Sequence, residues 1–122
     1  MALIDSSIKD DGDYNAEVIN QVEDVNQYTY DLVRRGMENM VNTNTRFDVI
    51  RKAGLQIAGK TGTAQESEDR PDHSYFTGFA PYDTPDIALT VVIPYGGGSS
   101  NAIPVFTDVV ANYYGIELDT KH

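Results

Sequence analysis

The chain has 122 residues, enough for one domain with a modest core, and 40% of them are hydrophobic. Its 19 acidic residues outnumber its 9 basic ones, for a net charge of -10, which argues against nucleic acid and anionic membranes as partners because basic residues dominate such binding. Cysteine is absent, which excludes disulfides, zinc–thiolate sites and a thiol nucleophile. The sequence predicts neither a metal site nor a cofactor.

The first 25 residues predict a short hairpin or strand–turn. Asp11-Gly12 is a strong signal for a tight turn, and residues 17–22 have the pattern of an extended segment. The acidic residues of this region are interpreted as a solvated surface.

A helix is predicted from a cap at Asn26 to about Asn42. Its apolar residues recur at spacings of three and four, which predicts one buried stripe: Tyr30, Val33, Met37, Met40 and Val41. A polar loop follows, and the short apolar patch 47–50 is expected to pack beneath it.

The stretch 54–65 predicts a strand rich in small residues, with Thr61 and Thr63 on one face and Lys60 on the other. Gly62 removes a side chain where a ligand or another backbone could approach closely. Residues 54–61 also match the phosphate-loop pattern G-x-x-x-x-G-K-[ST]. That alternative predicts magnesium-dependent ATP binding and needs a helix beginning at the lysine, whereas the residues that follow offer no apolar helical face.

Two further strands are predicted over 74–80 and 87–95, joined by a Pro- and Asp-rich turn and therefore antiparallel. His73, just before the first of them, is interpreted as structural, and residues 96–101 as a flexible loop. A final helix, with Pro104 in its first turn and Gly115 after its end, is expected to bury one apolar face: Val105, Phe106, Val109, Val110, Tyr113 and Tyr114. The fold class is therefore α+β, an antiparallel sheet of about three main strands with helices packed on it, in a single domain over 1–122.

Four segments together resemble a known family. They are Lys60-Thr61-Gly62-Thr63-Ala64-Gln65, the run His-Ser-Tyr-Phe-Thr-Gly-Phe-Ala-Pro over 73–81, the apolar strand 87–93, and the helical pattern 30–37. They are similar to the C-terminal part of a class B penicillin-binding protein transpeptidase domain, a serine D,D-transpeptidase with a β-lactamase-like fold. The K-T-G triplet alone is a weak signal, but K-T-G-T-A-Q followed by F-T-G-F-A-P is specific.

The resemblance implies roles for five residues. Lys60 would hold positive potential beside the nucleophile, and the N–H of Thr63 would be one oxyanion donor, so both are assigned to catalysis. Thr61, Gly62, Thr63 and Gln65 would form the substrate-binding strand, with the threonine hydroxyls on a carboxylate and Gln65 lining the cleft.

Two further family motifs are expected upstream of K-T-G, and their letter matches here lack the right context. Ser6-Ser7-Ile8-Lys9 spells S-x-x-K but runs into an acidic turn, and Ser99-Ser100-Asn101 spells S-x-N but follows K-T-G. The isolated chain is therefore predicted to be inactive, carrying half of a penicillin and substrate site. The alternative is a non-catalytic interaction or weak ligand-binding module with the same fold.

The resemblance also predicts partners and location. A peptidoglycan stem peptide or β-lactam would bind weakly or not at all to the chain alone, and the missing N-terminal part of the transpeptidase domain would complete the site. Without that part, strand 87–95 is expected to be an exposed edge open to self-association. The parent would be anchored in the bacterial cell membrane with this domain outside the cytoplasm, whereas the chain itself is expected to be soluble.

Overall fold

The structure of the chain, a computed structural model, describes residues 2–8 and 14–118. Its contacts divide the chain into two compact units, residues 1–31 and residues 32–122. No helix of the described ranges is both long and apolar enough to cross a membrane.

The first unit contains the expected hairpin. Strand β1, Ala2–Ile8, pairs antiparallel with β2, Tyr14–Gln21, in a two-stranded sheet. The predicted Asp11-Gly12 turn lies outside the described residues. Helix α1, Gln27–Asn42, begins in this unit. The backbone N–H of Thr29 donates to Asn26 Oδ1 at 2.9 Å, which confirms the cap at Asn26 because such a bond satisfies a donor that the first helical turn leaves free.

The apolar stripe predicted for α1 is wrong at Val33, whereas its other four residues are buried or half-buried. Val41 is fully buried and Met40 packs against the core, but Val33 is 58% exposed. Helical spacing identifies residues that share a face, whereas burial also requires a neighbouring element over that face. In the second unit α1 contributes its last turn to the core.

The segment after α1 is more ordered than expected. It forms a 3₁₀ turn, Thr45–Phe47, and a short helix α2, Asp48–Lys52. Asn44 begins the turn by accepting a hydrogen bond from the N–H of Arg46 at 3.0 Å. Phe47 and Ile50 belong to the main core, so the apolar patch 47–50 does more than pack beneath a loop.

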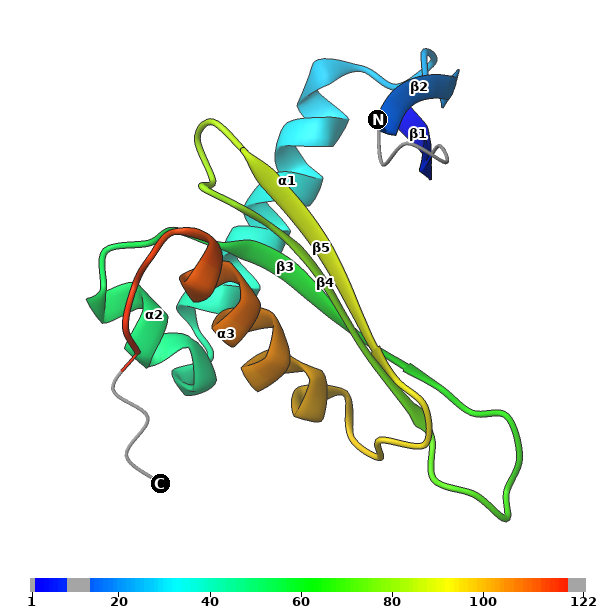
Figure 1. Ribbon diagram of the computed structural model, residues 1–122, viewed down its shortest axis with the longest axis vertical. Helices are drawn as coiled ribbons and strands as arrows, with labels where there is room; N and C mark the ends of the chain where they lie inside the picture. Colours follow the sequence, from blue (N-terminus) through cyan, green and yellow to red (C-terminus); the bar gives the residue numbers. More distant parts are fainter. Residues whose placement is uncertain (1, 9–13, 119–122) are drawn as a thin grey trace. The chain divides into compact units, whose positions relative to one another are not determined.

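The second unit is built on a three-stranded antiparallel sheet in the order β3-β4-β5. The strands are β3, Ala58–Ala64, β4, His73–Ala80, and β5, Ile87–Ile93 (Figure 1). This arrangement, with helices on the sheet, confirms the predicted fold class. Strand β3 begins at Ala58, four residues later than the predicted 54–65 strand. Leu55 and Ile57 precede it in a connecting segment, and their side chains still belong to the core.

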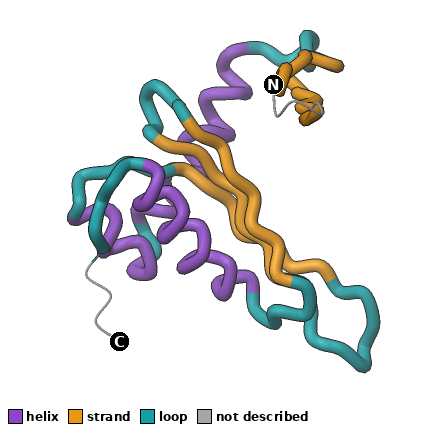
Figure 2. Tube along the Cα trace, viewed as in Figure 1, coloured by secondary structure: helices purple, strands orange, loops and turns teal. Residues whose placement is uncertain are grey.

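Helix α3, Ala102–Tyr113, packs against β4 and β5 (Figures 1 and 2). The Phe106 and Phe76 rings meet edge to face, with centroids 4.6 Å apart. The predicted apolar face is partly wrong, since Val105, Val109 and Tyr113 are exposed while Ala102, Ile103 and Ala111 are buried. Gly115 has a positive φ of 66° just after the helix, a conformation that favours glycine at a helix end.

The two faces of the sheet differ sharply. On the face toward α3, here called the inner face, Phe76 and Val91 are cross-strand neighbours and both are buried. On the outer face, Thr77 and Thr90 are neighbours and both are exposed. Side chains alternate between faces along a strand, so this register assigns every residue of β3 to one face or the other.

Candidate active site

Strand β3 carries four of the five predicted site residues, and Gln65 follows its end. The strand lies at an edge of the sheet and, within the described part of the chain, pairs only with β4. Along such an edge, backbone N–H and C=O groups remain available to a ligand or another chain. The strand order therefore places the predicted site residues on an open strand edge.

The register divides the predicted residues between the two faces. Thr61 lies opposite Phe76 and Thr63 opposite Ser74, so both threonines are on the inner face, as predicted. Lys60 lies opposite Thr77, on the outer face with Gly62. The structure thus brings the two hydroxyls to one side of β3 and the ammonium to the other. A ligand lying along the open edge can reach both sides.

Lys60 is exposed, and its Nζ donates a hydrogen bond to the backbone carbonyl of Thr61 at 2.7 Å. Among the described strand residues it is the only lysine or arginine on the outer face, whose other members are Ala58, Gly62, Ala64, His73, Tyr75, Thr77, Phe79, Ala88, Thr90 and Val92. Thr77 and Thr90 hydroxyls bond to each other, 2.8 Å apart. A second positive charge lies over this face at Phe79, where the Arg34 guanidinium is 5.7 Å from the ring centroid.

Close packing explains why glycine occupies positions 59 and 62, on either side of Lys60. A Cβ at Gly59 would collide with the Phe76 ring, and one at Gly62 would stand 3.3 Å from Tyr75 Cβ. The phosphate-loop alternative is wrong, because Lys60 and Thr61 lie within a strand that continues to Ala64 rather than at the start of a helix. Gly59 allows β3 to approach an aromatic ring, not a phosphate.

The structure also bears on the two letter matches that the sequence offers. Ser6 lies on strand β1, whereas Lys9 is outside the described residues. Ser99, Ser100 and Asn101 form a 3₁₀ turn before α3, and Asn101 Nδ2 donates to the carbonyl of Gly96 at 2.7 Å. Ser6 thus lies on a strand and not on the helix expected for the nucleophile, and the S-x-N match follows K-T-G in the chain.

One cluster next to the site was missed by sequence reasoning. Glu66, Arg70 and His73 gather around Tyr95, which follows β5. The hydrogen bond to Glu66 is the main cause that raises the pKa of the Tyr95 hydroxyl. The sequence signal for this cluster is Tyr95 followed by three glycines at 96–98. His73, predicted to be structural, accepts a hydrogen bond from the Tyr95 N–H at its Nδ1, 3.0 Å away.

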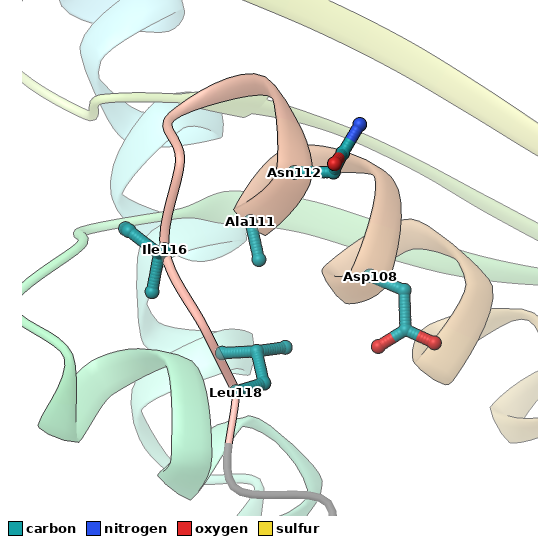
Figure 3. A pocket seen from close by; sticks show the side chains of 5 residues that line it. All are labelled: Asp108, Ala111, Asn112, Ile116 and Leu118. Atoms are coloured by element: carbon teal, nitrogen blue, oxygen red, sulfur yellow. The ribbon is translucent and has the colours of Figure 1, made fainter.

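A surface pocket of about 280 Å³ lies where α3 meets the segment that follows it (Figure 3). It contains none of the predicted site residues and is lined by Asp108, Ala111, Asn112, Ile116 and Leu118. Its one charged side chain is a carboxylate, which does not suit an anionic ligand. Among the residues that the structure describes, no group of three His, Asp or Glu side chains could hold a metal ion.

The known proteins that are similar to this chain carry related names, all of penicillin-binding proteins or peptidoglycan transpeptidases. The sequence model described as "Penicillin binding protein transpeptidase domain" matches residues 2–111. Peptidoglycan D,D-transpeptidase MrdA of Haemophilus influenzae is 38% identical over 106 residues, which cover 73% of this chain and 16% of MrdA. Penicillin-binding protein 2A of Bacillus subtilis is 35% identical over 88 residues, covering 65% of this chain and 12% of that protein.

Solved structures show the same relationship. PBP2 of Pseudomonas aeruginosa, in complex with WCK 5153, matches with a TM-score of 0.67 and 31% identity over 85% of this chain and 24% of its own. Penicillin-binding protein A of M. tuberculosis, in an imipenem acyl-enzyme complex, matches with a TM-score of 0.68 and 25% identity over 86% of this chain and 24% of its own.

The chain thus spans a small part of its curated relatives and about a quarter of these solved chains. The family match nevertheless extends over both compact units and nearly the full sequence given. This chain belongs to the penicillin-binding protein transpeptidase family.

Proposed function

We propose that the chain supplies the K-T-G half of the site of a peptidoglycan D,D-transpeptidase. The observation that carries the proposal is the open edge of β3, where Lys60 is the one charged side chain of the strand and Thr61 and Thr63 lie across the strand from it. Membership of the transpeptidase family gives this edge its chemical interpretation. The residues matched by that family model span both compact units, which supports treating 1–122 as part of one transpeptidase domain. The order of the motifs leads us to propose that it is the C-terminal portion.

The substrate class follows from the chemistry of the edge. A stem peptide is an extended chain ending in a carboxylate, and an extended peptide can add to a free strand edge through backbone hydrogen bonds. The Thr61 and Thr63 hydroxyls would donate to the carboxylate, and Lys60 would supply positive potential. A penicillin, which also carries a carboxylate, would occupy the same edge. Gly62 leaves the backbone accessible, and Gln65 would line the cleft beyond the end of β3.

Acyl transfer also needs a nucleophile, an activating base and oxyanion donors. The N–H of Thr63 would be one such donor, while the nucleophile and its lysine would come from the missing N-terminal part of the domain. We therefore propose that these 122 residues bind weakly and do not turn over substrate alone. The parent would be anchored in the cell membrane, with this domain outside the cytoplasm.

A non-catalytic interaction module is the second candidate. It is favoured by the exposed outer-face residues Thr77, Thr90 and Val92 and by β5, which pairs only with β4 within the described residues. Both surfaces could receive the rest of a transpeptidase domain or a second copy of this chain. Under this candidate the fold is kept and the β3 edge has no ligand of its own.

The test is a titration of the ¹⁵N-labelled chain with benzylpenicillin, and separately with a peptide ending in D-Ala-D-Ala, followed by amide NMR shifts. The proposal expects shifts concentrated over residues 60–65. Lys60→Ala should weaken binding roughly fivefold, the effect of losing about 1 kcal/mol from one exposed ion pair.

Lys52→Ala is the matched control, because Lys52 is an exposed lysine on α2 rather than on the sheet. It should leave the affinity unchanged. A well-dispersed spectrum that moves with neither ligand would overturn the binding proposal and favour the interaction module. An equal effect of the two lysine variants would show that only net charge matters.

A further inference from the structure

Tyr95 occupies an unusual backbone position. It has a positive φ of 54°, which bulky residues rarely adopt because Cβ then crowds the backbone. Residues 96–98, immediately after it, are all glycine, the residue type that adopts such a conformation readily. A tyrosine held there indicates that contacts of its side chain offset the strain.

Those contacts join Tyr95 to the loop between β3 and β4. Its hydroxyl donates to Glu66 Oε2 at 2.7 Å and accepts from Arg70 at 3.0 Å. The Arg70 guanidinium also lies over the Tyr95 ring, 5.5 Å from the centroid. The His73 ring packs against the same ring at 4.7 Å, and its Nε2 is 3.4 Å from Glu66 Oε2. We call Glu66, Arg70, His73 and Tyr95 the Tyr95 clamp.

The clamp holds the loop that connects β3 and β4. Pairing between β3 and β4 ends at Ala64 and His73, so the loop 65–72 lies beyond the sheet. Its far end is tied by the Gly97 N–H, which donates to the carbonyl of Asp72 at 2.9 Å. Its near end, next to Gln65, is tied to the rest of the unit through the Glu66 side chain, and Arg70, closer to the far end, contacts the same tyrosine. Figure 2 shows this loop and the segment after β5 at the same end of the sheet.

We propose that the Tyr95 clamp positions the end of the substrate strand, Thr63 and Gln65, before a ligand arrives. Because β3 has a partner on one side only, its end depends on the clamp to stay ordered. Ordering a loop during binding weakens affinity, and a preordered edge avoids that cost. Tyr95 is a positioning residue, because it acts through Glu66 and Arg70 and not on the ligand. The inference rests on the proposed function of the β3 edge.

The first measurement is independent of any ligand. Tyr95→Phe removes the hydroxyl but keeps the ring that packs against His73, so the fold should be retained. We expect ¹⁵N relaxation to report faster internal motion over residues 65–70, with β4 and β5 unchanged. Tyr113→Phe is the matched control, since Tyr113 is exposed on α3 and its hydroxyl makes no hydrogen bond in the described structure. Unchanged motion in Tyr95→Phe would overturn the clamp.

The second measurement is affinity for benzylpenicillin. Tyr95→Phe and Glu66→Ala should each weaken binding roughly fivefold, about the effect of one lost hydrogen bond. The double variant should lose less affinity than the sum of the two single losses, because both changes break the hydrogen bond between Tyr95 and Glu66 while each also removes a second contact. Increased motion without a loss of affinity would overturn the positioning role. Additive losses would show that the two residues act separately, and would also overturn it.

The two measurements separate this inference from the proposed function. If the unmodified chain does not bind the β-lactam, the proposed function fails and the ligand half of the inference fails with it. The relaxation data still decide whether the clamp orders the loop. If the unmodified chain binds and Tyr95→Phe binds equally well, the proposed function stands and the positioning role falls.

Discussion

Tyr114 couples the stability of the second unit to alkaline pH. Its hydroxyl lies 3.1 Å from the carbonyl of Ala80 and 3.3 Å from Asp86 Oδ2. Desolvation raises the pKa of Tyr114, and the negative charge of Asp86 raises it further. The folded chain therefore holds this proton to a higher pH than the unfolded chain does.

The sign of the pH effect follows from this shift. Below the unfolded pKa of 10.0 the phenol is protonated in both states and its contribution to stability is complete. As pH rises through that value, the unfolded state loses its proton first, so the free energy of unfolding falls until the folded pKa is passed. Tyr114→Phe should flatten this decline, as measured by urea unfolding at a series of pH values from about 8 to about 11.

Asp86→Asn is a graded variant for the same test. It removes the neighbouring negative charge and leaves the phenol in place, so the decline should be smaller than in the unmodified chain but still present. The same alkaline slope in the unmodified chain and in Tyr114→Phe would contradict the assignment to Tyr114.

The packing of β4 on α3 depends on Gly78. A Cβ at this position would stand 2.7 Å from the carbonyl oxygen of Ala58 and 2.8 Å from the Phe106 ring. Gly78→Ala should therefore destabilise the chain by about 1–3 kcal/mol, as expected when a well-packed core is overfilled. The measurement is the midpoint of chemical denaturation at an unchanged denaturant slope.

Gly36→Ala on α1 is the matched control, because no atom lies within 4 Å of the added Cβ. Alanine is the better helix former, so this variant should be more stable by roughly 0.5–1 kcal/mol. If the two alanine variants had similar effects, the shape of the β4–α3 contact would not be the reason for glycine at position 78.

Elements with a strong local signal could be predicted from the sequence. The cap at Asn26, the antiparallel strands and the end of α3 at Gly115 depend on residues close together in the chain. The K-T-G strand was identified through its neighbours in sequence, and its alternation correctly separated Lys60 from the two threonines. The five site roles themselves remain predictions.

The errors concern contacts between distant residues. Val33 and Val109 fit an apolar helical face, yet they are 58% and 43% exposed in the described part of the chain. Phe47 and Ile50 looked like a minor patch but help to form the main core. The contacts of Tyr95 join residues 25 and 29 positions apart, a separation at which local patterns carry no information.

In the described part of the chain, the sheet of the second unit has two edge strands, β3 and β5. The β5 edge predicts that the chain associates with itself. Val92 is 48% exposed on β5, and the strand pairs only with β4 in the described part of the chain. An exposed apolar edge tends to pair with another chain. We expect the chain to dimerise at high concentration, and Val92→Lys to shift the equilibrium toward monomer, as measured by sedimentation.

Val109→Lys is the matched control, because Val109 is 43% exposed on helix α3 rather than on a strand. It adds the same charge and should leave the association unchanged. Sedimentation that shows only monomer at high concentration would remove the self-association proposal, and an equal effect of the two lysines would assign it to net charge.

The spatial order of β3, β4 and β5 is also their order along the chain. Each pair is closed by a short connection, residues 65–72 and then 81–86. Closing a loop of about ten residues takes roughly 10–100 ns and costs little chain entropy, so sheets built from sequence neighbours form quickly. The strand that carries Lys60 can therefore find its partner early in folding, while more distant contacts are still being made.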